Sequence, residues 1–145
     1  MCNNNNSTSV SIKAFNNTNQ TVLTNGSLSL LNTEITGGCC NDITVNNNAI
    51  TIKKAGTYLI NVSANLTATV AGTETLQLYN KGVAVPAAIA SRTAADATSL
   101  ENINFSIIIN VNSSCNCVNN NALLTLVNTG VGATYANVVI NIIKV

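Results

Sequence analysis

The 145-residue chain contains no histidine and no tryptophan, and it has a single proline. Without histidine a Ser/His/Asp triad cannot form, and the commonest general base of enzymes is missing. The acidic residues are scattered and mark neither a carboxylate pair for catalysis nor a calcium-binding run: Glu34, Asp42, Glu74, Asp96 and Glu101. We therefore expect no enzymatic activity and no cofactor.

Charged residues make up only 8% of the chain and aromatic residues 3%. Nucleic-acid binding needs clustered Lys and Arg or aromatic platforms for bases, and six scattered cations with five aromatics provide neither. No apolar run of about 18 residues is present, so we expect no membrane span. The first seven residues lack the basic and apolar regions of a signal peptide.

The sequence instead contains 46% apolar residues, and about a fifth of the chain is asparagine. A polar but nearly uncharged surface is unusual for a free monomer, which normally stays soluble through charge. Such a surface suits packing against copies of itself, although codon bias in an AT-rich genome would also enrich asparagine. We expect a flexible N-terminal arm at residues 1–9 and a single domain at residues 10–145.

Alternation of apolar and polar residues predicts β-strands along the whole chain. In residues 57–66 one side carries Tyr58, Ile60, Val62, Ala64 and Leu66, and Leu59 is the exception on the other side. In residues 100–112 only Ile108 breaks the pattern. The expected strands are residues 10–15 (as an edge), 21–23, 28–35, 43–53 (as one strand or two), 57–66, 75–79, 83–85, 100–112, 122–127 and 136–145, with a strand and loop in 87–97. Eight to ten short strands predict an all-β antiparallel jelly-roll sandwich.

The last two predicted strands are apolar on both faces. A sandwich strand needs only one apolar face for the core. The second apolar face would be exposed to solvent unless another surface buries it. We interpret it as a subunit interface, and the alternative is a central strand covered by loops. The candidate trimer-interface residues are Leu123, Val127, Val139, Ile143 and Val145.

Two stretches resemble the tumour-necrosis-factor (TNF) and complement-one-q superfamily. Residues 55–65, Ala-Gly-Thr-Tyr-Leu-Ile-Asn-Val-Ser-Ala-Asn, are similar to its Gly-x-Tyr strand, and residues 76–86, Leu-Gln-Leu-Tyr-Asn-Lys-Gly-Val-Ala-Val-Pro, to the strand that follows. The apolar ending, residues 136–145, resembles the bacterial branch, the C-terminal domain of collagen-like exosporium glycoproteins. The resemblance covers residues 28–145 and implies a TNF-like homotrimer with its C-terminal strand near the three-fold axis. Unlike that branch, the sequence shows no Gly-X-Y repeat.

Five cysteines also depart from the family pattern: Cys2, Cys39, Cys40, Cys115 and Cys117. Their spacing is not the two-to-four gap of common zinc sites, so we expect no metal. An odd number leaves one sulfur free or bonded to another chain, and we predict intersubunit disulfides. The alternative is an internal bond between the 39/40 and 115/117 pairs. These loops would share one end of the barrel if residues 80–82 form a bulge, and lie at opposite ends if the chain reverses there.

These features favour a structural, self-assembling protein with itself as partner, a trimeric jelly roll on a bacterial spore or cell surface. The alternative function is a trimeric binding head that recognises a receptor or carbohydrate.

Overall fold

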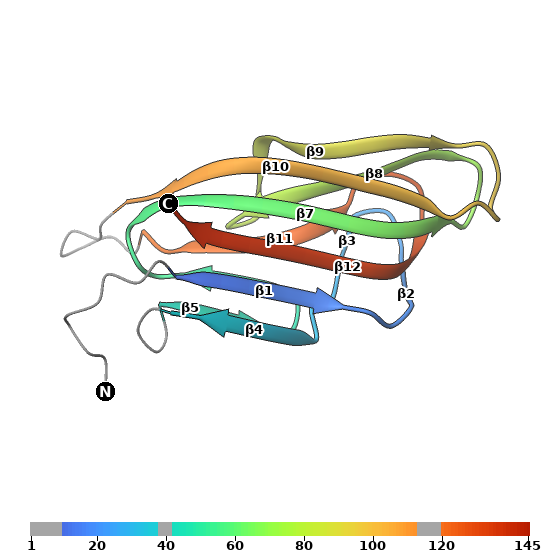
Figure 1. Cartoon of the computed structure of the whole chain (residues 1–145). Coiled ribbons are helices and arrows are strands. Elements are labelled where there is room, and N and C mark those ends of the chain that lie inside the picture. Colours follow the sequence, from blue (N-terminus) through green and yellow to red (C-terminus); the bar gives the residue numbers. More distant parts are fainter. Residues whose placement is uncertain (1–9, 38–41, 113–119) are drawn as a thin grey trace.

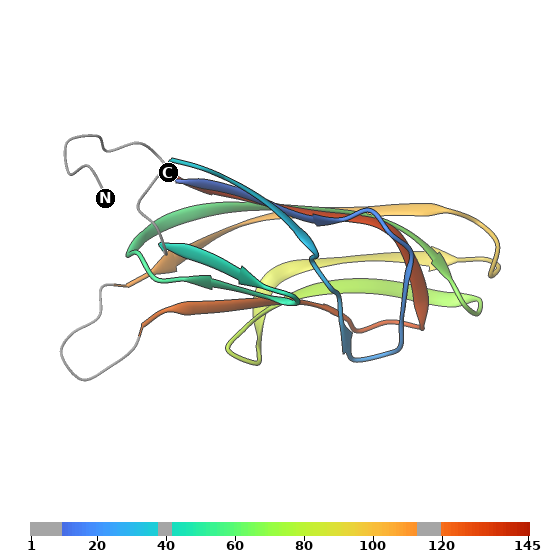
Figure 2. The ribbon, with the colours of Figure 1, turned by 90° about the horizontal axis from the view of Figure 1, so that it is seen from below.

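The computed structural model describes residues 10–37, 42–112 and 120–145. In these segments the chain forms twelve strands in two six-stranded antiparallel sheets that lie face to face (Figures 1 and 2). Sheet A contains β1 (Ser11–Asn16), β2 (Gln20–Val22), β4 (Asn32–Thr36), β7 (Gly56–Ala68), β10 (Glu101–Val111) and β12 (Ala133–Lys144). Sheet B contains β3 (Gly26–Ser27), β5 (Ile43–Asn46), β6 (Ala49–Ile52), β8 (Gly72–Asn80), β9 (Val83–Ala94) and β11 (Ala122–Asn128).

The predicted all-β antiparallel sandwich is confirmed. The strands outnumber the eight to ten expected because several are only two to four residues long, such as β2 and β3. Residues 1–9 lie outside the described residues, so the predicted flexible arm stays a prediction. No described segment forms a helix with the length and apolar character needed to cross a membrane.

The core lies between the sheets and follows the alternation of the sequence. In β7 the five side chains predicted to share a face are all buried, and β12 buries every second residue from Val138 to Ile142. Sheet B meets them with a matching apolar face: Ile50, Ile52, Leu76, Leu78, Leu124 and Leu126. Burial of these side chains is the main favourable contribution to folding.

Two expectations for the N-terminal third were wrong. Residues 10–15 are not an edge, because β1 pairs with β12 on one side and β4 on the other. Residues 28–35 are not one strand: the chain leaves sheet B after β3 and enters sheet A at β4. Leu28 and Leu30 are buried in this crossing, and their backbone N–H groups donate to Leu126 and Asn47 carbonyls at 2.9 and 2.6 Å. The alternating burial of residues 28–30 therefore resembles that of a strand, although these residues belong to no β-strand.

Two tight reversals determine where the later strands begin. Residues 43–53 form the hairpin β5–β6, and Lys81 and Gly82 form the hairpin β8–β9, so residues 80–82 are a full reversal. Because both segments reverse, the described residues that flank the two cysteine-containing gaps lie at the same end of the sandwich: Gly37, Asp42, Asn112 and Asn120 (Figure 1). A reversal at residues 80–82 was expected to place the two cysteine-containing loops at opposite ends of the barrel. This expectation is wrong for the described residues that flank them.

Candidate interaction surface

The five predicted interface residues lie on two different faces. Val139, Ile143 and Val145 belong to the outer face of sheet A, whereas Leu123 and Val127 belong to the outer face of sheet B. Ile143 is 37% exposed, Val145 69% and Leu123 41%. Because the two faces point away from each other, a single flat interface cannot contain all five residues.

The register of sheet A arranges its outer face in rows across the strands. One row begins with three apolar residues, Ile108 of β10, Leu59 of β7 and Ile143 of β12, and continues with Ser11 and Thr36. The next row contains short polar side chains and ends in an ion pair: Ser106, Asn61, Asn141, Lys13 and Glu34. The third row is mixed: Asn104, Ser63, Val139, Phe15 and Asn32. Residues distant in sequence therefore share one continuous surface.

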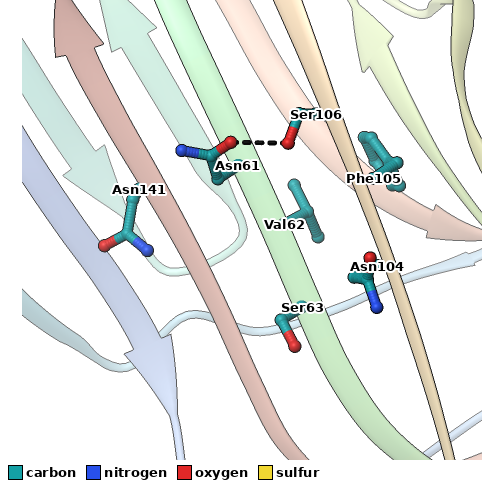
Figure 3. Close-up of a pocket in the computed structure, with 7 residues that line it drawn as sticks. All are labelled: Asn61, Val62, Ser63, Asn104, Phe105, Ser106 and Asn141. Carbon is teal, nitrogen blue, oxygen red and sulfur yellow. Dashed lines mark hydrogen bonds between the residues drawn. The ribbon is translucent and has the colours of Figure 1, made fainter.

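Short side chains between bulkier rows leave the face hollowed. One hollow of about 280 Å³ is lined mainly by β7 and β10, and a second of about 310 Å³ extends toward β1 and β4. Asn61 and Asn141 line both, and Figure 3 shows these two amides on neighbouring strands, with the Ser106 hydroxyl bonded to Asn61. The Ser106 Oγ donates to Asn61 Oδ1 at 2.6 Å.

Several other polar groups on this face bond to one another across the strands. Thr57 Oγ1 donates to Asn110 Oδ1 at 2.8 Å, and Asn102 Nδ2 donates to Asn65 Oδ1 at 2.8 Å. Neutral groups that already have partners cost less to remove from water than charges do. The face is therefore suited to being covered by another protein surface.

Charge on the outer rows of sheet A is confined to one margin. Lys13 Nζ and Glu34 Oε2 lie 2.6 Å apart, with both side chains partly exposed, and the ammonium also lies 5.3 Å from the centroid of the Phe15 ring. An exposed pair of this kind contributes about 0–1 kcal/mol to stability. It also fixes the polar edge of the surface beside β4.

A second unusual feature is buried between the sheets. The Glu74 carboxylate and the Tyr135 hydroxyl are fully buried, and neither accepts or donates a hydrogen bond of good geometry within the described residues. Burial raises the pKa of Glu74 above its usual value of 4.5, and Glu101 raises it further, whereas the Ala68 N–H and Arg92 oppose the shift. Burial likewise raises the pKa of Tyr135, with Glu74 adding to it.

The cysteine predictions stay untested, because Cys2, Cys39, Cys40, Cys115 and Cys117 all lie outside the described residues. Within the part of the chain that the structure describes, no group of three or more acidic, His or Cys residues is placed to hold a metal ion.

Sequence reasoning missed several residues of the sheet A face. Lys13 and Phe15 were assigned to an edge strand, and Leu59 and Ile108 were noted only as exceptions to the alternation. These two exceptions were the available signal, because an apolar residue on a polar face marks a place where cover is needed. Their alignment with Ile143 depends on strand register, which the sequence pattern does not give.

No protein-family model matches the chain, and no curated protein matches it in sequence. Among solved structures, murine APRIL at pH 5.0 superposes with a TM-score of 0.67 at 8% identity, covering 95% of this chain and 100% of that chain. Eiger, a TNF of S. frugiperda, gives 0.63 at 8% identity, covering 94% and 91%. The PRD1 vertex protein P5 gives 0.57 at 13% identity, covering 94% and 96%.

These neighbours are TNF-family jelly rolls and a viral vertex protein. At such low identity they establish the fold, and the predicted TNF-like jelly roll is confirmed. The more specific resemblance to the bacterial exosporium branch stays a proposal.

Proposed function

We propose that this TNF-like jelly roll is a structural, self-assembling subunit of a bacterial spore or cell surface. Three copies pack the outer faces of their sheets A around a three-fold axis, with β12 nearest to it. Intersubunit disulfides through Cys2 and the 39/40 or 115/117 cysteines then lock the assembly.

One observation carries the trimer proposal. β12 is an interior strand of sheet A. It places Val139 and Ile143, with Val145 just beyond its end, on an outer face whose charge in the described rows is confined to the Lys13–Glu34 pair at the β4 margin. A face with little charge and three aligned apolar side chains loses little on desolvation and gains from apolar burial. The TNF-like fold supports the same arrangement by resemblance.

The trimer proposal predicts that Ile143→Lys abolishes trimer formation while Leu123→Lys does not. The two residues are similarly exposed, at 37% and 41%, but lie on opposite faces. In the I143K variant the introduced ammonium groups of three subunits would be buried together without partners, at a cost of several kcal/mol. Size-exclusion chromatography with light scattering, in reductant, would give about 45 kDa or more for the wild type and L123K, and about 30 kDa or less for I143K, because the chain mass is 15.0 kDa.

Circular dichroism would check that both variants stay folded. A wild type that is monomeric at tens of micromolar contradicts the trimer proposal. Dissociation by L123K but not by I143K would instead assign the interface to sheet B.

The binding-head alternative is favoured by the hollows on sheet A, where amides and hydroxyls of Asn61, Ser63 and Asn141 would suit the hydroxyl groups of a carbohydrate. The same face cannot both pack in a trimer and hold a ligand. Glycan-array binding by a monomeric wild type, abolished by Asn61→Ala, would support that alternative over the structural one.

A further inference from the structure

The four outer strands of the two sheets differ in how well they are protected against pairing with another chain. Sheet A ends in β10 and β4, and sheet B in β5 and β9. Natural edge strands avoid association by being short, charged, bulged or interrupted by proline. β4 and β5 have only five and four residues, and β4 carries Glu34.

The long edge strand β9 has several protective features. It contains Pro86 and Arg92, Ala87 has a φ of +63°, and its register with β8 shifts between Gln77 and Tyr79. Pro86 has no backbone N–H to donate, and the irregular backbone bends the edge away from a straight ladder.

The edge strand β10 has none of these features. It pairs with β7 in unbroken register over all eleven residues, and its only charge is Glu101 at the first position. No proline and no positive φ occurs in it. After Glu101 the strand is a neutral run of Asn, Ser and β-prone apolar residues, which is the composition that readily adds a further strand.

Hydrogen-bond alternation shows which backbone groups point to the open side. Val145 N–H donates to Thr57 O, so the odd-numbered residues of β7 bond to β12 and the even-numbered ones to β10. The β10 partners of these even residues are odd-numbered, from Glu101 to Ile109. The N–H and C=O groups that point away from β7 therefore belong to Asn102, Asn104, Ser106, Ile108 and Asn110.

Within the described residues, these outward backbone groups have no protein partner in a strand ladder or turn. The open side also leaves Phe105 and Ile107 only partly buried, although both pack against the core. An added strand would bond the free backbone groups and cover these two side chains at once.

We propose that β10 pairs antiparallel with β10 of a second copy of this chain, joining two sheets A about a two-fold axis. The strand is close to self-complementary when the axis passes through Ile107. On the outer side amides then face amides, in the pairs Asn102–Asn112 and Asn104–Asn110. On the core side apolar residues face apolar residues, in the pairs Ile103–Val111 and Phe105–Ile109. One outer pair, Ser106–Ile108, is mixed. No two charges are opposed among the described residues, and this match selects a second copy as the occupant.

The pairing extends the proposed assembly beyond the trimer, and in that respect it rests on the proposed function. The β10 edge points along the plane of sheet A, whereas the trimer face points along its normal, so one subunit can use both. A trimer with one two-fold contact per subunit would propagate into a layer or close into a cage. Without the trimer, the same contact gives only a dimer.

The test compares Asn104→Pro with Asn104→Thr. Proline removes one N–H on the open edge and leaves the hydrogen bonds to β7 in place, whereas threonine keeps that N–H. Both variants lose the bond from Asn104 Nδ2 to Asn102 Oδ1, so they are matched in that respect. Native masses would be measured in reductant at equal concentration.

We expect the wild type and N104T to form particles above 45 kDa that N104P reduces to trimers. If the trimer proposal fails, N104T would give dimers of about 30 kDa and N104P monomers of 15.0 kDa. Equal masses for N104P and N104T would overturn the β10 pairing, whatever the state of the trimer.

Hydrogen exchange on the wild type gives a second test that needs no variant. At high concentration the amides of Asn104, Ser106 and Ile108 should be protected, and on dilution they should exchange at least tenfold faster. The amides of Phe105 and Ile107 bond to β7 and should stay protected throughout. Fast exchange of the even-numbered amides at every concentration would overturn the proposal.

Discussion

At the scale of single residues, Glu74 is the least expected feature of the core. Its carboxyl group is buried, it raises the pKa of Tyr135, and the charged groups that act on its own pKa are Glu101 and Arg92. Arg92 Nε bonds to Glu101 Oε2 at 2.5 Å and is therefore already engaged. Burying an unpaired charge is costly, and this raises the pKa of the Glu74 carboxyl group in the folded chain.

Glu74 gives a pH-dependent prediction. Because its pKa is raised on folding, its contribution to stability is complete below about pH 4.5 and is lost as the pH rises through the folded-state pKa. The slope is at most about 1.4 kcal/mol per pH unit. Glu74→Gln carries no titrating proton, so the wild type should lose stability relative to E74Q between pH 4 and pH 8 in urea unfolding.

Glu34→Gln is the control for this titration, since Glu34 is 63% exposed and lies on the surface of sheet A. The difference in unfolding free energy between E34Q and the wild type should change much less over the same range. A wild-type-minus-E74Q difference that is equal at pH 4 and pH 8 would rule out the role given to this carboxyl group.

At the scale of elements, the tight turn between β8 and β9 sets the pairing of Asn80 with Val83. Lys81 and Gly82 have φ of +51° and +77°, as in the primed turns that suit the twist of paired strands. A β-carbon at Gly82 would meet no atom within 4 Å, so packing does not limit this position. Only the backbone conformation requires glycine there.

The turn predicts that Gly82→Val lowers the free energy of unfolding by about 1–2 kcal/mol, because a β-branched residue is strained at positive φ. Gly82→Asn should cost less, since asparagine tolerates this conformation. Urea unfolding midpoints of the two variants provide the comparison. Equal losses would mean that the side chain, not the backbone, sets the preference.

At the scale of the whole molecule, the cysteines decide whether the assembly is covalent. The described flanks of both cysteine-containing gaps, together with Val10 and Val145, lie at one end of the sandwich. This placement is compatible with bonds inside one chain and with bonds between chains. Cross-links between subunits would constrain the unfolded chains and toughen the assembly.

We predict that mass spectrometry of the unreduced protein finds Cys2 bonded to a 39/40 or 115/117 cysteine of another chain. Electron micrographs should show fibres or sheets that resist denaturant and come apart in it only when reductant is added. Cys2→Ser should remove the cross-linked species and leave the non-covalent assembly intact. Bonds found only within single chains would exclude covalent assembly.

The sequence alone determined which side chains form the core, because alternation is a local property of a strand. Every second residue from Tyr58 to Leu66 and from Val138 to Ile142 is buried as the pattern predicts, whereas the sequence left open whether residues 80–82 form a bulge or a reversal. The confirmed jelly-roll class followed from these short, regularly spaced strands.

Only the tertiary structure decided which strands are neighbours and in what register, since pairing joins residues far apart in the chain. It placed Leu123 and Ile143 on opposite faces, made β1 interior and β10 an open edge, and aligned Ile108, Leu59 and Ile143 in one row. It also enclosed Glu74 beside Tyr135. The candidate surfaces follow from these long-range contacts, which local alternation cannot specify.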